Sequence, residues 1–249
     1  MKQRNPGFQR FLTARLAPGE VYGLPVQAGL VLILVAASIF ATITWQVVQR
    51  SPLTDLDMRL AQQFHGYADS GWTVVMLAIT HAHATVPLLI LAGLFAAYLY
   101  GQRAYWWVLT VALTVPSGML LNVGLKNIFQ RMRPQFDEPL VILTTYSFPS
   151  GHANGATLLY GVIAAYCLCR LKTRSARLAA CMAAATMAVL VALSRVYLGA
   201  HFLSDVMAGM AEGICWLTVC ITTITATRHR LAAAAVANAH ESPAWTRQR

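Results

Sequence analysis

The stretch Ser194-Arg-Val-Tyr-Leu-Gly-Ala-His201-Phe-Leu-Ser-Asp205 lies where one long apolar segment ends and the next begins. It holds a cation, an imidazole and a carboxylate, at Arg195, His201 and Asp205. If the chain is helical from residue 203, His201 and Asp205 lie one turn apart on the same face. A carboxylate there fixes the tautomer of the imidazole and raises its basicity, and an arginine nearby suits an anion. Taken alone, the stretch fits equally well an interfacial His–Asp pair that only satisfies itself at a helix end.

The composition indicates a membrane protein. Of the 249 residues, 57% are hydrophobic and only 11% are charged, whereas soluble domains carry about 25% charged residues. The net charge is +10, but the basic residues cluster beside apolar segments, which is typical of membrane orientation. No nucleic-acid-binding signature is present, so we expect no nucleic-acid partner. The five cysteines lie in or beside apolar segments and contain no CxxC pair, which favours small buried hydrophobes over disulfides or metal ligands.

The apolar segments predict an all-α, integral membrane bundle of six transmembrane helices. Residues 24–48 carry no charge, which is enough to cross about 30 Å of hydrocarbon and too long for a signal-peptide core. After a polar, partly helical loop (49–70), we expect a short re-entrant or interfacial helix at about 70–82. The remaining spans are expected at about 84–100, 105–125, 153–169, 178–193 and 203–227. Residues 23–227 then form the membrane domain, between an N-terminal tail (1–22) and a C-terminal tail (228–249).

The basic residues orient this bundle. Thirteen of the 19 Lys and Arg residues lie in the two tails and in the turns on their side of the membrane. Because cytoplasmic loops are enriched in Lys and Arg, both tails are predicted to be cytoplasmic. Four of the six exceptions lie in polar motifs, which suggests that they have a role other than topology. We expect a multi-pass protein of the bacterial inner membrane, with its active site facing the periplasm or exterior.

Three polar clusters interrupt the spans, at 126–134, 147–152 and 194–205. They close the third span, open the fourth, and join the fifth span to the sixth. The six-span topology brings all three to the non-cytoplasmic face. Clusters far apart in sequence but at one depth predict a single site.

The residue types in these clusters predict a phosphate ligand. Arginine forks match phosphate oxygens, and lysine supplies a point charge. Ser150 is a natural N-cap, Gly151 permits close backbone approach, and free N–H groups at a helix start bind anions. The predicted phosphate-binding residues are Lys126, Arg133, Ser150, Gly151 and Arg195.

Two histidines in unlike settings predict catalysis. His201, backed by Asp205, suits a nucleophile, and His152, with no acid near it in sequence, suits a general acid for the leaving group. The predicted reaction is in-line attack of His201 on phosphorus, followed by hydrolysis of the phosphohistidine by water. The predicted catalytic residues are His201, His152 and Asp205, and no metal or cofactor is expected.

The three clusters together resemble the three-part signature of the type 2 phosphatidic acid phosphatase family, which is related to vanadate haloperoxidases. The parts are Lys126 followed after six residues by Arg133-Pro134, the run from Pro149 to His152, and the run from Ser194 to Asp205. The match covers about residues 84–226, so residues 1–70 carry no weight in it. The resemblance implies metal-independent hydrolysis of phosphate monoesters or diphosphates by a six-helix core.

Other polar residues leave alternatives open. His81 and His83 fit ordinary interfacial histidines better than headgroup ligands, and Arg131 fits a solvated loop charge better than a ligand. Glu212, an acid at membrane depth, either supports the site from below or is hydrogen-bonded within the bundle.

The substrate is expected to be a lipid phosphate presented by the membrane. Undecaprenyl diphosphate is the first choice, with phosphatidylglycerol phosphate, phosphatidic acid and lipid A as alternatives. A lipid-to-lipid phosphotransferase uses the same residues, because a phosphohistidine does not dictate its acceptor. An anion transporter is the alternative outside the enzymes, but the spans offer few polar residues for a pathway. The oligomeric state is not predicted.

Overall fold

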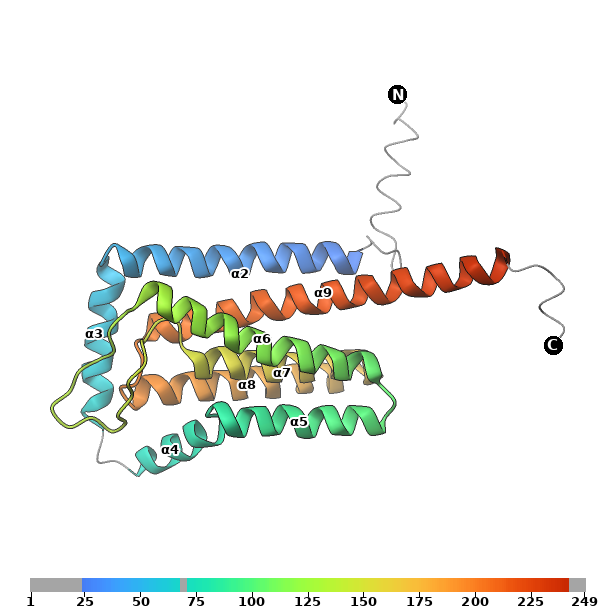
Figure 1. The fold of residues 1–249 in the computed structure, drawn as a ribbon. Helices are drawn as coiled ribbons and strands as arrows, with labels where there is room; N and C mark the ends of the chain where they lie inside the picture. Colours follow the sequence, from blue (N-terminus) through green and yellow to red (C-terminus); the bar gives the residue numbers. More distant parts are fainter. Residues whose placement is uncertain (1–23, 68–70, 242–249) are drawn as a thin grey trace, which may run out of the picture.

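The computed structural model describes residues 24–67 and 71–241, and within these ranges every regular element is a helix (Figure 1). The predicted tail 1–22 lies outside the described residues. The helices are, in chain order, α2 (Leu24–Val48), α3 (Pro52–His65), α4 (Trp72–Ala82), α5 (Thr85–Gly101), α6 (Tyr105–Phe129), α7 (Gly151–Arg170), α8 (Arg174–Tyr197) and α9 (Leu203–Glu241).

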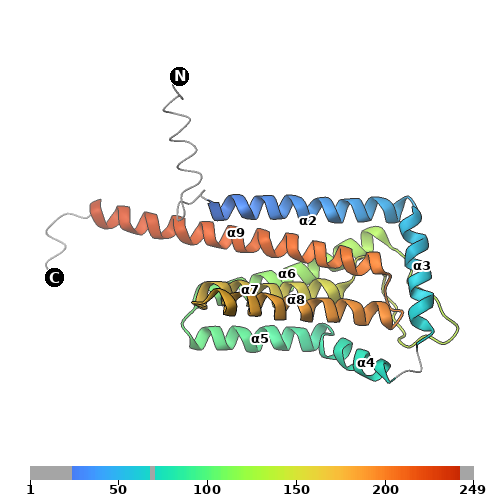
Figure 2. The same ribbon diagram turned by 180° about the vertical axis from the view of Figure 1, so that it is seen from behind.

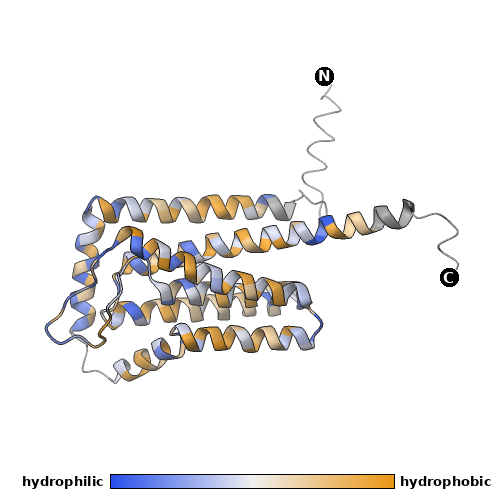
Figure 3. Ribbon diagram, viewed as in Figure 1, coloured by the Kyte–Doolittle hydropathy of each residue, from blue (hydrophilic) through white to orange (hydrophobic). Residues whose placement is uncertain are grey.

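The six long helices run along one common direction, and α3 lies across one end of them (Figures 1 and 2). The two views agree that α2 lies beside α9, and these helices are in contact. Helix α7 packs against α5, α6, α8 and α9. Apolar residues predominate along the long helices, and polar residues gather at their ends and in the connecting loops (Figure 3). The expected all-helical membrane bundle is therefore confirmed.

The main core forms where α5, α6 and α7 meet. Its buried side chains include Leu88 and Leu99 of α5, Val115 of α6, and Leu158 and Val162 of α7. Each of these side chains is at most 1% exposed. This core holds α5, α6 and α7 together along their length, from Leu88 near the start of α5 to Leu99 near its end.

The expected short helix before the second span is confirmed. Helix α4 ends at Ala82, and α5 begins at Thr85 with a bend of 59° between them. The break coincides with His83, whose Nδ1 donates to Ile79 O of α4 and whose Nε2 accepts from the Tyr160 hydroxyl of α7. Pro87 follows near the start of α5, where proline is tolerated. The partly helical loop predicted for 49–70 is also confirmed, since α3 occupies most of it.

The expected count of six spans is confirmed only in part. Within the described residues, four helices are long and apolar enough to cross a membrane, at Gln27–Val48, Tyr105–Phe129, Arg174–Tyr197 and Leu203–Ala235. The bent pair α4 and α5 makes five if it is taken as one span. Helix α7 does not reach the same apolarity. Because α7 is surrounded by other helices, its side chains contact protein and need not be as apolar as side chains that face lipid.

The last helix extends beyond its expected end at residue 227. Helix α9 continues to Glu241. The segment from 228 was expected to be a polar, alanine-rich tail, and it begins as helix because alanine has the highest intrinsic helix propensity. The sequence from 228 to 241 contains no Gly or Pro to end the helix.

Candidate active site

All three predicted clusters lie at the end of the bundle that α3 crosses (Figure 1). Lys126 is in the last turn of α6, and Arg133 is in the loop that follows it. Gly151 and His152 open α7, and Arg195 is in the last turn of α8. The turn from α8 to α9 brings in His201. In that turn Gly199 has φ +64°, a conformation that favours glycine. A Cβ at this position would also lie only 2.6 Å from a ring carbon of Phe136, so glycine is required for both reasons.

These groups line one cavity of about 490 Å³. Its polar lining includes all three predicted cations and both predicted catalytic histidines, namely Lys126, Arg133, His152, Arg195 and His201. Its apolar lining comes mainly from α5 and α6, namely Leu88, Leu89, Pro116, Met119, Leu120 and Val123. The cavity therefore combines a charged lining with an apolar lining.

The contacts of His201 define which nitrogen carries its proton. Arg133 Nη1 lies 3.1 Å from His201 Nε2. Because a guanidinium can only donate, Nε2 must hold the lone pair. The proton is then on Nδ1, which lies 3.4 Å from Ser147 Oγ and 3.5 Å from Asp205 Oδ2. The expected His201–Asp205 pair is formed, and the basic nitrogen faces the cavity cations.

The surroundings of His201 keep the ring neutral. The side chain is buried. Burial holds the pKa of His201 well below its usual range, and the positive charges of Arg133, Lys126 and Arg195 lower it further. A neutral imidazole is the form that can attack phosphorus, once Arg133 Nη1 donates to a phosphate oxygen instead of to Nε2.

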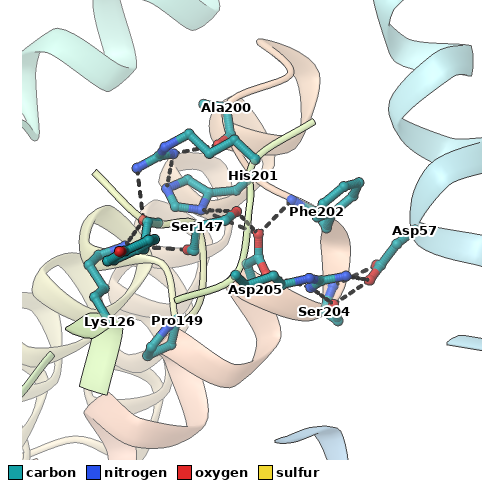
Figure 4. A network of polar contacts seen from close by, with 12 residues as sticks. Asp57, Lys126, Ser147, Pro149, Ala200, His201, Phe202, Ser204 and Asp205 are labelled. Carbon is teal, nitrogen blue, oxygen red and sulfur yellow. Dashed lines mark hydrogen bonds and ion pairs between the residues drawn. The ribbon is translucent and has the colours of Figure 1, made fainter. Parts of the chain in front are cut away.

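Asp205 is fully buried and accepts hydrogen bonds at both oxygens (Figure 4). Oδ2 accepts from the Phe202 backbone N–H at 2.9 Å and from the Ser147 hydroxyl. Oδ1 accepts from Arg131 Nη1 at 2.6 Å. Asp205 is thus fixed from three directions beside the His201 ring. Ser147 lies in the predicted cluster 147–152, but its bridging role was not predicted.

Two of the cations predicted to bind phosphate are held by backbone carbonyls of the α6–α7 loop and of the turn between α8 and α9. Arg133 donates from Nε to Thr145 O at 2.7 Å and from Nη1 to Ala200 O at 2.5 Å. Lys126 Nζ donates to Tyr146 O at 2.8 Å. Burial lowers the pKa of Arg133, which nevertheless remains a cation at neutral pH. The loop carbonyls orient both cations toward the cavity.

Arg195 lines the cavity from the last turn of α8. Its side chain is buried, and Nη1 donates to the hydroxyl of Thr80 in α4. Its Nε is buried without a hydrogen-bond partner in the described part of the chain. A buried guanidinium N–H that lacks an acceptor is costly, and an anion in the cavity would supply that acceptor. Thr80 was not among the predicted site residues.

The start of α7 differs from expectation at Ser150. The helix does begin at Gly151 with Ser150 as N-cap, but the Ser150 side chain makes no capping hydrogen bond. Ser150 is buried and does not line the cavity, and its backbone N–H donates to Asp205 O at 2.9 Å. The reason is the close packing of α9, since a Cβ on Gly209 would lie 2.4 Å from Ser150 O. Gly151 does line the cavity.

The residues with open alternatives fall into two groups. His81 is exposed, whereas His83 is buried, lines the cavity and places Nε2 2.6 Å from the Tyr160 hydroxyl. Glu212 is buried and accepts from Asn122 Nδ2 at 2.7 Å, and Asn122 lines the cavity. The predicted support of the site by Glu212 therefore stays a prediction, and Asn122 is the residue through which Glu212 would act.

Arg131 is not a solvated loop charge. Arg131 forms ion pairs with Asp205 at 2.6 Å and with Asp57 of α3 at 2.8 Å. Asp57 lies in the segment 1–70, outside the region of the family resemblance, so this ion pair was not predicted. No local pattern in the sequence marks this pair, because its members lie on separate elements.

In the described ranges, no three His, Cys, Asp or Glu side chains come together in a way that could hold a metal ion. The metal-independent reaction stays a prediction, since it rests on the family resemblance and on the chemistry of the cation set.

Comparison with known proteins agrees with this geometry. The family model of the PAP2 superfamily matches residues 104–228. Phosphatidylglycerophosphatase B of Bacillus subtilis is 40% identical over 141 residues, which are 56% of this chain and 69% of that protein. Lipid A 1-phosphatase of Rhizobium etli is 32% identical over 165 residues, which are 62% of this chain and 66% of that protein.

Two solved structures share the fold. The crystal structure of a transmembrane PAP2 type phosphatidylglycerolphosphate phosphatase from Bacillus subtilis superposes with a TM-score of 0.66 at 33% identity, covering 77% of this chain and 93% of that one. The crystal structure of Aquifex aeolicus LpxE gives a TM-score of 0.54 at 21% identity over 67% of this chain and 94% of that one, a likeness of fold alone. The chain therefore belongs to the PAP2 superfamily, as a multi-pass bacterial membrane protein that hydrolyses lipid phosphates.

Proposed function

We propose that this phosphatase removes the terminal phosphate monoester of a glycerophospholipid, with phosphatidylglycerol phosphate as its preferred substrate. The observation that carries the proposal is the single cavity in which Lys126, Arg133 and Arg195 surround the Nε2 side of His201. One such cation cluster suits one dianionic phosphate. The choice of lipid is supported by the relative and the solved structure from Bacillus subtilis, whose names describe this activity.

The apolar side of the cavity supports a lipid as the leaving group. Leu89, Leu120 and Val123 line the cavity and are also exposed on the outside of α5 and α6. In a bilayer, such side chains face acyl chains. A substrate can therefore place its phosphate among the cations while its acyl chains stay in the hydrocarbon.

The first chemical step is attack by His201. The Nε2 lone pair forms a bond to phosphorus as the bond from phosphorus to the lipid oxygen breaks. His152, which also lines the cavity and starts the cycle as an imidazolium beside the anionic phosphate, donates its proton to the leaving oxygen, so the lipid departs as a neutral alcohol. The His201 ring becomes positively charged, and Asp205 and the Ser147 hydroxyl beside Nδ1 stabilise that charge.

The second step returns the enzyme to its starting state. A water molecule attacks phosphorus, His152 accepts a proton from it, and the bond between Nε2 and phosphorus breaks. Inorganic phosphate is released. In both steps Lys126, Arg133 and Arg195 stabilise the charge on the equatorial oxygens, and the Gly151 backbone N–H at the start of α7 is a further donor.

The site faces the non-cytoplasmic side in this proposal. The support is the distribution of basic residues, which favours the opposite end of the bundle for the cytoplasm. The inner membrane of a bacterium provides this arrangement, with the phosphate presented in the outer leaflet. Undecaprenyl diphosphate and lipid A are presented at the same face and are the competing substrates.

The test is phosphate release by the purified full-length protein in mixed micelles, with each lipid in turn and with EDTA present. We expect the highest kcat/KM with phosphatidylglycerol phosphate and no effect of the chelator. A higher kcat/KM with undecaprenyl diphosphate would replace the proposed substrate. Transfer of phosphate to a second lipid, without free phosphate, would make the protein a phosphotransferase.

The nucleophile is tested with His201→Gln, matched by His81→Gln at an exposed position outside the cavity. We expect His201→Gln to lose on the order of 10³-fold or more of kcat, as for removal of a nucleophile in other covalent hydrolases. His81→Gln should retain wild-type activity. An acid-labile phosphoenzyme should form in the wild-type protein and in His81→Gln, and not in His201→Gln. Phosphoenzyme formation in His201→Gln would overturn the assignment.

A further inference from the structure

We propose that Asp57 of α3, acting through Arg131, is a positioning residue for the His201–Asp205 pair, so that an element outside the matched family region completes the active site. The inference rests on the proposed function, because it assigns His201 as the nucleophile. The matched region begins at residue 104, whereas Asp57 lies in the helix that crosses the end of the bundle.

Asp57 is fully buried, and its side chain contacts Ser204 in the first turn of α9 (Figure 4) and also Arg131. Its Oδ1 accepts from the Ser204 backbone N–H at 2.9 Å, and its Oδ2 accepts from the Ser204 hydroxyl. Ser204 is the second residue of α9. A carboxylate at that position satisfies an otherwise unpaired N–H of the first turn and interacts favourably with the helix dipole. Asp57 therefore holds the turn that carries Asp205.

Arg131 joins the two carboxylates. Nη2 lies 2.8 Å from Asp57 Oδ2, and Nη1 lies 2.6 Å from Asp205 Oδ1. Nη1 also donates to Ser204 Oγ at 2.7 Å. The guanidinium carbon lies 4.4 Å from the ring centroid of Phe202, which packs over it. A planar guanidinium held at both ends in this way has one orientation.

The charges of this group decide the chemistry. Arg131 alone would cancel the charge of Asp205, and the His201 imidazolium formed during attack would then face a neutral pair. With Asp57 included, two carboxylates share one guanidinium, and the group of three carries a net charge of −1. Because all three side chains are largely shielded from water, that charge is felt at His201. Asp57 thus leaves Asp205 its negative charge for the transition state.

The central experiment uses the full-length enzyme with Asp57→Asn. Asparagine has the same size and keeps an oxygen acceptor for the Ser204 N–H, but it removes the negative charge and the acceptor that faces Arg131 Nη2. We expect kcat to fall by about 10- to 100-fold, the usual range for a residue that acts through another ligand of the site. KM and the inhibition constant of inorganic phosphate should stay within about threefold, because the cavity cations are unchanged.

The matched control is Asp55→Asn, which makes the same chemical change on the same helix at an exposed position. It should retain wild-type kcat. A fall in kcat equal to that of Asp57→Asn would mean that the helix as a whole, and not the Asp57 charge, is needed, and this would overturn the proposal.

A double variant separates charge from structure. In Asp57→Asn/Arg131→Gln both added charges are gone, and Asp205 again carries a net charge of −1. We expect its kcat to be at least threefold higher than that of Asp57→Asn alone. A role that is only structural predicts the opposite, since the double variant loses more contacts. A double variant that is no faster than Asp57→Asn would therefore overturn the charge argument.

Failure of this inference is distinguishable from failure of the proposed function. If His201→Gln is inactive and Asp57→Asn has wild-type kcat, only the role of Asp57 is wrong. If His201→Gln still forms a phosphoenzyme, the proposed mechanism is wrong and the inference falls with it. Thermal unfolding of each variant in detergent identifies a folding defect, in which case the recovery of kcat in the double variant decides.

Discussion

Helices α2 and α7 are both long, uncharged over most of their length and part of the same bundle, yet they meet different neighbours. Helix α2 packs on α9 and leaves large side chains exposed, such as Val31 at 60% and Leu34 at 67%. Helix α7 is surrounded by four helices and buries nine residues, including polar Asn154 and Thr157. The apolarity of a segment therefore reports its contact with lipid. The helix that carries His152 is the less apolar one because it contacts protein.

The largest expected effect comes from removing the same side chain on each helix. Leu158 of α7 is fully buried in the main core, so Leu158→Ala should cost about 2–5 kcal/mol through lost contacts and a cavity. Leu34→Ala on α2 should stay within about 0.5 kcal/mol, because lipid tails fill the space that the leucine leaves. Thermal unfolding in lipid-containing micelles measures both. Equal losses would contradict the difference between the two helices.

A second comparison concerns the glycines at the two contacts of α9. A Cβ on Gly209 would lie 2.4 Å from Ser150 O, a backbone atom at the start of α7. A Cβ on Gly29 of α2 would lie 2.6 Å from Thr222 Oγ1, a side-chain atom that can rotate away. We expect Gly209→Ala to cost about 1–3 kcal/mol and to lower kcat by displacing the α7 start, and Gly29→Ala to cost less. Activity and unfolding temperature are measured together. Full activity in Gly209→Ala would show that α7 tolerates the shift.

The smallest expected effect is a pH dependence of stability that arises from the buried His201. Helix α2, which faces lipid, contains no histidine. Unfolding exposes His201, which then takes up a proton near its ordinary pKa of about 6.5, whereas the folded pKa is lower. Stability contributed by His201 is therefore present above that pH and is lost as the pH falls below it. The loss reaches at most about 1.4 kcal/mol per pH unit.

The measurement compares unfolding temperatures at pH 7 and pH 5 for the wild type and His201→Gln. The drop between the two pH values should be smaller in the variant, because glutamine does not titrate. An equal drop in both proteins would mean that His201 binds a proton in the folded state as readily as in the unfolded state. Other titrating groups contribute equally to both proteins and cancel in the comparison.

Much of the site could be predicted from sequence because its residues lie at the ends of apolar segments. The length of a segment fixes where it leaves the membrane, so Lys126, His152 and Arg195 had to meet at one face. The spacing of His201 and Asp205 likewise predicted a shared face within one turn. These predictions depend on local periodicity and on membrane thickness, which the sequence encodes directly.

The remaining features depend on packing between elements that are distant in sequence. Asp57 meets Arg131 only because α3 lies across the end of the bundle, and a short polar helix carries no signal for that direction. Ser150 is buried and does not line the cavity, and α9 packs closely on its backbone at Gly209. Residues 1–70 lie outside the family resemblance, so the resemblance gave no reason to expect that Asp57 pairs with Arg131, the same side chain that pairs with Asp205.

Leu89 and Leu120 line the cavity and also face outward from α5 and α6, so the enzyme meets its substrate within the plane of the bilayer. The quantity that sets its rate is then the mole fraction of lipid phosphate in the membrane. Adding inert lipid at constant bulk concentration should slow it. The two products also separate by phase, since the lipid alcohol mixes with the surrounding lipids and inorganic phosphate dissolves in water. Because the products enter different phases, this separation favours hydrolysis over the reverse reaction.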